Sequence, residues 1–323
     1  LSREALFLLN NLLFMSVLVV CFWGVIFPLV SEFFTGQKVT VGPPFYQRAT
    51  GPLFAGLMLL MGIAPLSAWG HSSLQSIGRA LWKSALAALA LIVLVFFTYT
   101  KNVIALIGFY LVALVIFVTL QEFWRATRAR QRAQHENFFT SLARLTGRNR
   151  RRYGGYLIHL SMMLMAIGIL GINLFQVQTQ GTVPVDGKLN IQGYTVQYSS
   201  IAAFPGPDGR QVTRAVVNVY KNNQYLGQLY PRIDYYPDAQ QTMTIPGERP
   251  TLSDDLYIIL VDWQPASSNG ATFKIYVNPL VNWLWIGAFI FIFGILIAAW
   301  PDKDPEYVPV VTHNKAHQPS SAD

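Results

Sequence analysis

The sequence has few charged residues and a single cysteine, and each scarcity excludes a class of protein. Charged residues make up 12% of the 323 residues, about half their usual share in soluble proteins, while apolar residues make up 52%. This balance argues against an ordinary soluble domain and predicts a membrane protein. The lone Cys21 lies within an apolar run, so an internal disulfide and a Cys-x-x-Cys redox or metal site are excluded. The chain also has no P-loop, dinucleotide fingerprint or zinc-ligand spacing.

Long apolar stretches are what the sequence has in abundance. Each of six stretches is long enough to cross the hydrocarbon core of a bilayer, which takes about 20 helical residues. Backbone groups in lipid must bond internally, so we expect helices. The third and fourth stretches are separated by only three residues and predict a tight helical hairpin. The six stretches are 5–30, 52–69, 82–100, 103–120, 156–175 and 280–300.

The net charge of +8 is concentrated in one segment. Residues 121–152 hold nine arginines and two glutamates, so the charge is not a basic surface for nucleic acid, and we expect no nucleic-acid partner. Short basic loops stay in the cytoplasm. We therefore predict a cytoplasmic Arg-rich loop over 121–155, an outer loop over 31–51 and an inner loop over 70–81. Both termini are then cytoplasmic, and the polar tail 301–323 is expected to be disordered.

The Arg-rich loop has more than one possible role. It sets the orientation of the chain and meets anionic membrane lipid. Its arginines also suit haem propionates or the acidic face of a partner. Arg152 lies about two helical turns before His159, so a propionate contact from Arg152 is geometrically possible.

Residues 176–279 have a different character. Apolar and polar residues alternate there, with many β-branched and aromatic side chains, and Lys221-Asn222-Asn223 separates two such runs as a hairpin turn. We predict a small extracytoplasmic domain of about six to eight short strands, a sandwich or an open barrel. The fold class is therefore a polytopic α-helical membrane protein with about six transmembrane helices and an inserted small all-β domain. The helical part comprises four helices within 1–120, a fifth over 156–175 and a sixth over 280–300.

His159 lies inside the fifth apolar stretch, where an ionisable side chain is a functional candidate. On a helix, Gly155 and Met163 share its face, and Met162 flanks them. Glycine leaves room for a flat macrocycle, methionine packs softly against an aromatic plane, and neutral imidazole ligates haem iron. Three interpretations stay open: a haem ligand, an imidazole bonded to a neighbouring helix, and a proton relay. No other histidine lies in a predicted span, so a second haem ligand would come from outside the chain.

A second candidate is the stretch 38–48, predicted to lie on the outer side. Gly42, Pro43 and Pro44 impose an extended or turned backbone there, and Phe45 and Tyr46 add aromatic surface. The stretch is either a partner-docking loop or a rigid loop packed on the membrane surface.

Several motifs, in order along the chain, resemble the C-terminal half of the CcmF family, which contains the haem lyase subunit of system I cytochrome c maturation; the NrfE paralogues are similar. The VGPP loop and the GG-Y-x-x-H helix are the most specific. The motifs are "SREALFLLNN", "KVTVGPPFYQR", "YGGYLIHLSMMLMAIGI", "LYPRIDYYP", "DLYIILVDW" and "NPLVNWLWIGAFI".

The resemblance implies a function. In the family, two intramembrane histidines ligate a transmembrane b-type haem, and one of them matches His159. That haem passes electrons, with quinol as the donor, to haem carried by the chaperone CcmE. The lyase then joins haem to the cysteines of a Cys-x-x-Cys-His apocytochrome c presented by CcmH- and CcmI-type subunits. The family places the lyase in the bacterial inner membrane, with the β-domain periplasmic.

The sequence also departs from the family pattern. The Trp-rich segment that holds the substrate haem and the other histidines would precede residue 1, so we expect a split C-terminal subunit or a truncated portion. Its partner is then an N-terminal half with the Trp-rich segment. Arg232 replaces a residue that is usually acidic. No catalytic residue is assigned, and a non-haem assembly or scaffold subunit, or a transporter, remains the alternative.

Overall fold

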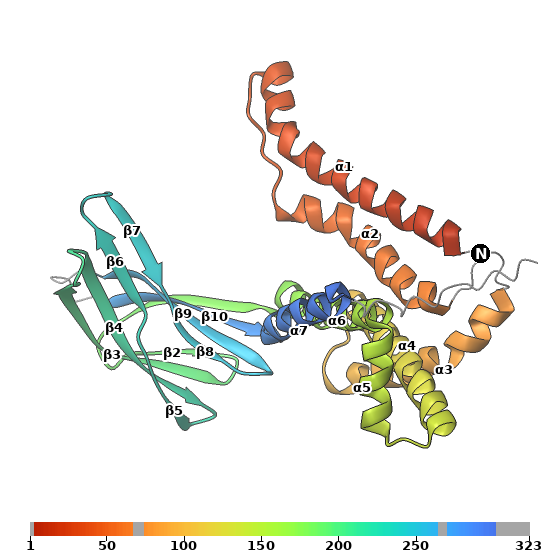
Figure 1. Ribbon diagram of the computed structural model, residues 1–323. Helices are drawn as coiled ribbons and strands as arrows, with labels where there is room; N and C mark the ends of the chain where they lie inside the picture. The colour runs from red at the N-terminus through yellow and green to blue at the C-terminus, as the bar shows by residue number, and fades with distance from the viewer. Residues whose placement is uncertain (1–2, 67–73, 264–269, 302–323) are drawn as a thin grey trace, which may run out of the picture.

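The computed structural model describes residues 3–66, 74–263 and 270–301, which form a helical part and a β-domain. The β-domain extends away from the helices and is joined to them through two neighbouring helices (Figure 1). The helices are α1 (Arg3–Thr35), α2 (Pro43–Ile63), α3 (Leu74–Thr98), α4 (Val103–Gln134), α5 (Phe138–Arg148), α6 (Arg150–Phe175) and α7 (Asn282–Ala299), with a 3-10 turn, η1 (Ala64–Leu66), after α2.

Six of these helices, all except α5, are long and apolar enough to cross a membrane. The predicted polytopic helical architecture with an inserted β-domain is therefore confirmed, and the protein is a membrane protein. The predicted hairpin between α3 and α4 is also present. Asn102 caps α4 by accepting hydrogen bonds from the backbone amides of Ile104 and Ala105, at 3.0 and 3.3 Å.

The predicted loops on either side of α2 are shorter than expected. α1 continues to Thr35 and α2 begins at Pro43, so the connection between them is 36–42 rather than 31–51. Pro43 and Pro44 start the helix instead of holding a loop, because proline fixes a helical φ and its missing amide is not needed in a first turn. The predicted inner loop 70–81 is likewise helical from Leu74 onward, and residues 70–73 lie outside the described part.

The Arg-rich segment 121–155 was predicted as a loop, and this prediction is wrong. α4 continues through it to Gln134, α5 follows, and α6 begins at Arg150 rather than at 156. Arginine, glutamine and alanine are good helix formers, so the segment extends the helices beyond their apolar parts. The chain turns between α4 and α5 at His135, whose φ of 51° is left-handed. The predicted tail 301–323 lies outside the described residues except for Pro301.

The described residues of the β-domain form ten strands in two antiparallel sheets, more than the six to eight predicted. One sheet has the order β1-β10-β9-β8; the other has the order β2-β3-β4-β6-β7, with β5 also pairing with β4. Alternate residues of both sheets are buried in a common apolar core. The strands are β1 (Val177–Val183), β2 (Lys188–Ile191), β3 (Tyr194–Pro205), β4 (Gln211–Lys221), β5 (Gln224–Leu229), β6 (Arg232–Tyr236), β7 (Gln241–Ile245), β8 (Gly247–Pro250), β9 (Asp254–Trp263) and β10 (Ala271–Pro279).

The predicted hairpin turn after Lys221 is confirmed. β4 ends at Lys221 and β5 begins at Gln224, so the loop has two residues, Asn222 and Asn223. Their φ angles are 49° and 66°, both positive. Two-residue hairpin loops of this kind match the twist of the strands, and asparagine tolerates the left-handed region better than most residues.

The β-domain is inserted between two helices that lie against each other. α6 leads into β1, β10 leads into α7, and β1 pairs with β10 from Val177↔Val277 onward. The side chain of Gln176 donates a hydrogen bond of 2.6 Å to Asn278 at this junction. The paired helices therefore continue directly into paired strands, and the domain is held at both of its connections (Figure 1).

Glycines bring α6 and α7 close together. A Cβ on Gly154 or Gly168 would lie 2.8 Å from the backbone nitrogen of Ala298 or Leu284 of α7. On the other helix, a Cβ on Gly287 would lie 2.7 Å from the backbone oxygen of Ser161. Small residues let helix backbones approach in membranes, where packing rather than hydrophobicity drives association. The α6–α7 pair thus requires these glycines.

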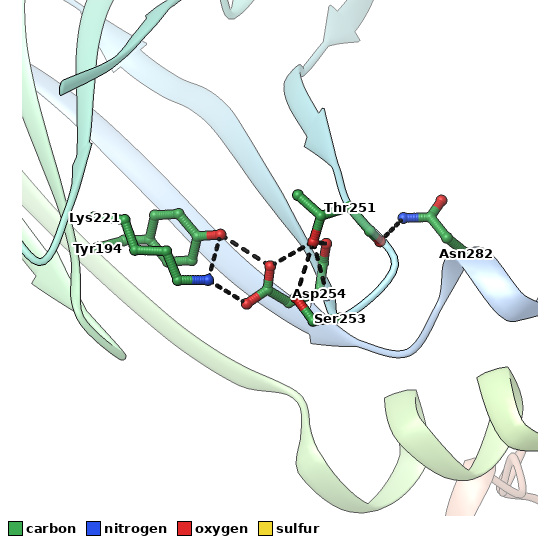
Figure 2. A network of polar contacts seen from close by, with 6 residues as sticks. All are labelled: Tyr194, Lys221, Thr251, Ser253, Asp254 and Asn282. Carbon is green, nitrogen blue, oxygen red and sulfur yellow. Dashed lines mark hydrogen bonds and ion pairs between the residues drawn. The ribbon is translucent and has the colours of Figure 1, made fainter. Parts of the chain in front are cut away.

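A partly buried polar network ties the β-domain to the start of α7 (Figure 2). Lys221 Nζ lies 2.8 Å from Asp254 Oδ2, and the Tyr194 hydroxyl donates to Asp254 Oδ1 at 2.9 Å. Thr251 Oγ1 also donates to Asp254 Oδ1 at 2.9 Å, while Asn282 of α7 donates to the Thr251 carbonyl at 2.6 Å. The network links both sheets to the last helix.

We predict that Gly168→Ala destabilises the protein by about 1–3 kcal/mol, because the added Cβ would clash with the α7 backbone. The measurement is the thermal unfolding midpoint of the full chain in detergent. Gly78→Ala is the matched control: Gly78 is a helical glycine of α3 with open space around its Cβ position, so its midpoint should stay the same or rise. Equal decreases of the unfolding midpoint in Gly168→Ala and Gly78→Ala would show that the close contact between Gly168 and α7 does not stabilise the protein.

We predict that Asp254→Asn lowers the free energy of unfolding by about 2 kcal/mol at neutral pH. Burial opposes the charge, but hydrogen bonds from Lys221, Tyr194 and Thr251 outweigh it and hold the pKa of Asp254 below its ordinary value. The stabilisation is therefore complete above the ordinary carboxyl pKa and is lost as the pH falls through the lowered pKa of the folded state.

The test is a pH series of unfolding measurements on the wild type and on Asp254→Asn. The difference between them should shrink as the pH falls below about 4. Asp208→Asn removes an exposed carboxylate, paired with Arg210 at 3.4 Å, and should change stability little. A difference that stays constant down to low pH would show that the Asp254 charge contributes nothing.

Candidate functional site

His159 lies on the face of α6 that is directed toward α4 and α2. One turn further along the same face, Met163 is buried against Val112 and Val115 of α4. Met58 and Met61 of α2 pack against the same cluster. Ala166, seven residues after His159, is also buried there. Because residues four and seven apart share a helix face, the burial of Met163 and Ala166 against α4 and α2 places the His159 imidazole on the side of α6 that faces these helices.

The imidazole of His159 is only partly satisfied by its surroundings. The side chain is half-buried, and its Nδ1 atom is buried without a hydrogen-bond partner among the residues that the structure describes. A buried polar nitrogen without a partner costs free energy, and such groups are rare in folded proteins. Nδ1 therefore gives no support to the interpretation that the His159 imidazole is hydrogen-bonded to a neighbouring helix.

The two glycines before His159 have different roles. Gly154 is buried, and a Cβ there would clash with the backbone of α7. At Gly155, one turn before His159, a Cβ would meet nothing within 4 Å. The predicted clear approach beside the imidazole is thus present at Gly155, while Gly154 serves the contact with α7.

The predicted position of Met163 beside a macrocycle does not match its burial. Met163 is only 2% exposed and packs within the cluster between α6, α4 and α2. Its neighbour Met162 is 39% exposed, so Met162 has the freer thioether. The structure therefore places Met163 as a packing residue beneath the His159 face.

Arg152 is near the start of α6 and already has protein partners. It donates from Nε to the Tyr156 hydroxyl at 3.1 Å and forms an ion pair with Glu122 of α4 at 3.4 Å. Its side chain is still 57% exposed. The structure thus brings Arg152, Gly155 and His159 onto one helix, with the guanidinium tied to α4 rather than directed at the imidazole.

The structure does not place a second ligand beside His159. Among the described residues no group of three or more His, Cys, Asp or Glu side chains is close enough to hold a metal ion. His135 is exposed at the end of α4, and the remaining histidines, His71, His313 and His317, lie outside the described part. A second histidine ligand opposite His159 would therefore come from beyond these residues.

In the predicted docking stretch 38–48, some residues are exposed and others pack against α1. Gly42, Pro43 and Pro44 are exposed, while Phe45 and Tyr46 are half-buried in the first turn of α2. The Tyr46 ring lies against Gly24 of α1, where a Cβ would overlap it. Tyr46 thus has a structural role in the α1–α2 pair, and the exposed surface of this stretch is its Gly-Pro-Pro segment.

An ion cluster between α4 and α5 was not predicted from the sequence. Glu136 pairs with Arg130 at 3.3 Å and with Arg144. Burial opposes the charge of Glu136, but hydrogen bonds from Arg144 and Arg130 hold its pKa below the ordinary value. The available signal was that Glu136 is one of two acidic residues among nine arginines, which makes it the natural partner of several of them.

Comparison with known proteins agrees with this architecture. Residues 174–279 match the family model described as the CcmF C-terminal beta-sandwich. The chain is 28% identical to the cytochrome c-type biogenesis protein Ccl1 of Rhodobacter capsulatus, covering 91% of this chain and 43% of the relative. It is 26% identical to CcmF of Pseudomonas fluorescens, covering 92% of this chain and 44% of the relative.

The fold is also that of a solved structure. The structure of the cytochrome c haem lyase CcmF matches with a TM-score of 0.73 and 21% identity, over 93% of this chain and 46% of that one. The chain thus spans less than half the length of the relatives it matches. Together, these matches identify the chain as similar in sequence and in fold to the C-terminal half of CcmF, with residues 174–279 matching the family model of its C-terminal β-sandwich.

Proposed function

We propose that this chain acts in cytochrome c biogenesis as the membrane-embedded C-terminal part of a CcmF-type haem lyase, in which His159 supplies one axial ligand to a b-type haem. The similarity to Ccl1 and CcmF supports the first half of this proposal. One observation carries the second half: the half-buried imidazole of His159, within a membrane-spanning helix, has a buried Nδ1 without a partner.

The residues around His159 fit a haem. In a neutral imidazole one ring nitrogen has a lone pair that can bind iron, and the other carries an N–H that can donate a hydrogen bond. The described residues provide no hydrogen-bond partner for Nδ1 of His159. The open space at Gly155 lets a flat ring approach the helix backbone. Haem bound there would supply a one-electron carrier between a donor, proposed to be quinol, and a second haem. The contribution of the chain is to hold and orient the iron through His159.

Arg152 is a candidate for binding a haem propionate. Its guanidinium is more than half exposed, and Tyr156 and Glu122 hold it in place near the start of α6. A haem propionate that formed an ion pair with Arg152 would share its guanidinium with the carboxylate of Glu122. The role we propose for Arg152 is therefore orientation of the haem edge.

The second axial ligand and the site for the substrate haem are proposed to lie on an N-terminal half that carries the Trp-rich segment. His135, the other histidine of the described residues, is exposed at the end of α4 and does not face His159 along a span. A complete lyase then forms when the N-terminal half brings its ligand to the haem held by His159.

The arginines set the proposed orientation in the membrane. Short basic segments stay on the cytoplasmic side, so the start of α6 is proposed to be cytoplasmic. His159 is nine residues from Arg150, about 14 Å along the helix, so the haem is proposed to lie in the cytoplasmic half of the bilayer of a bacterial inner membrane. The β-domain is then periplasmic, where CcmE, CcmH- and CcmI-type subunits and the apocytochrome would meet it.

We predict that His159→Ala abolishes most haem binding when the chain is purified with its N-terminal half. Removing a residue that only hydrogen-bonds to a metal ligand already lowers metal affinity about 10-fold or more, and this substitution removes the ligand itself. The measurements are haem content per chain and the reduced-minus-oxidised absorption spectrum. His159→Gly with added imidazole should recover part of the spectrum, because the free base can occupy the vacated position.

His135→Ala is the matched control, since it removes an exposed histidine from the same chain and should leave haem content unchanged. Unaltered haem content and an unaltered spectrum in His159→Ala would disprove the ligand assignment. A preparation of both halves without any pigment would instead favour a non-haem assembly subunit.

A further inference from the structure

An apolar groove of about 620 Å³ runs between α5 and the last turns of α7. From α5, Phe139 and Leu142 line it, and from α7, Phe293, Leu296 and Trp300. Arg150, at the start of α6, is the single charged residue among those that line it, and its guanidinium donates to the Pro301 carbonyl at 2.8 Å. The groove therefore has a cationic end beside Trp300 and is apolar along α7.

The walls of this groove are largely uncovered. Phe139 is 81% exposed, Trp300 66% and Phe293 60%. Phe293 and Trp300 are seven residues apart, so the exposed wall extends about 10 Å along α7 away from the helix end. Such a slot, parallel to a membrane-spanning helix, has the shape and polarity of an acyl-chain site.

Arg150, which lines the groove, and its sequence neighbours Arg148 and Arg151 have no acidic partner in the part of the chain that the structure describes. Within the described part of the chain, the two glutamates of the segment are already used: Glu122 pairs with Arg125 and Arg152, and Glu136 with Arg130 and Arg144. The other five arginines of the segment form no ion pair among the described residues, and three of them, Arg148, Arg150 and Arg151, lie around the junction of α5 and α6.

The start of α6 adds to this positive potential. Its first turn contains no acidic residue, and Asn149 makes no side-chain capping hydrogen bond. The first amides of a helix lack internal partners and carry the positive end of the helix dipole. Arginines beside such an end are unfavourable on their own, whereas an anion there is stabilised by both. The junction is thus built to receive a negative group.

We propose that this groove binds an anionic phospholipid, with its phosphate at Arg148, Arg150 and Arg151 and one acyl chain along α7. The groove explains why the ligand is a lipid rather than a free phosphate, because phosphate alone would leave the apolar wall uncovered. The lipid wedges α5 against α7 and so fixes the base of the helix pair that carries the β-domain. This inference is independent of haem binding at His159.

The experiment is native mass spectrometry of the purified full chain in detergent, titrated with phosphatidylglycerol or with phosphatidylcholine of the same acyl chains. The wild type should retain phosphatidylglycerol preferentially. Arg150→Gln/Arg151→Gln should lower that affinity about 30-fold, because each arginine near an anionic headgroup contributes about fivefold. Arg128→Gln/Arg132→Gln removes two exposed arginines of α4 that do not line the groove, and this matched control should retain the preference.

A second variant tests the groove itself. Gly147 lines it, and a Cβ there meets nothing within 4 Å, so Gly147→Trp should fill the slot without straining the backbone. We expect this variant to lose bound phosphatidylglycerol while keeping its unfolding midpoint. Retention of the lipid by Gly147→Trp, or an equal loss in both arginine pairs, would overturn the proposal.

Two further outcomes would assign the groove to another occupant and also overturn the proposal. Inorganic phosphate that displaces phosphatidylglycerol at equal concentration would show that the arginines bind phosphate alone. Binding of phosphatidylglycerol that appears only after deletion of 302–323 would show that this segment of the chain occupies the groove.

Discussion

The close contact between α6 and α7 is the constraint on which the rest of the structure depends. Gly154 and Gly168 allow the two backbones to touch, and no larger residue could occupy their positions without moving α7. Because the β-domain is inserted between these helices, the same contact determines where β1 and β10 leave the membrane and pair. It also orients α6: with Ser161 facing α7, His159, two residues away, is turned toward the opposite side of the helix.

Three polar side chains of the protein, those of Asp254, Asp234 and His159, differ in how their surroundings satisfy them. Asp254 lies in a network in which every oxygen has a donor, and Asp234 is completely buried but lies between Arg210 and Arg232 at 3.5 and 3.3 Å. Both carboxylates hold parts of the β-domain together. His159 differs because its buried Nδ1 has neither a hydrogen bond nor an ion pair among the described residues. An unpaired buried nitrogen costs free energy, and this cost disappears if a ligand or another chain supplies a partner for Nδ1.

Much of the architecture could be predicted from local patterns. Six apolar stretches of membrane length predicted six helices, and alternation with β-branched residues predicted the β-domain and its turn at Asn222-Asn223. The errors concerned the number of strands and the ends of elements. Pro43 and Pro44 looked like a loop because proline disfavours helix interiors, yet a first helical turn accepts it. The Arg-rich segment looked like a loop because it is polar, although arginine, alanine and glutamine favour helices when packing allows.

The sequence by itself determined which residues could share a face. The spacing of Gly155, His159 and Met163 places them on one side of α6 wherever the helix packs, because the period of a helix is local. Only the tertiary structure decided what each of them meets. Gly154 and Gly155 are adjacent and chemically identical, yet one meets the α7 backbone and the other open space. Met163 became a core residue, and Glu136 became the partner of Arg130 and Arg144, because these contacts depend on how separate helices pack, which no single stretch of sequence specifies.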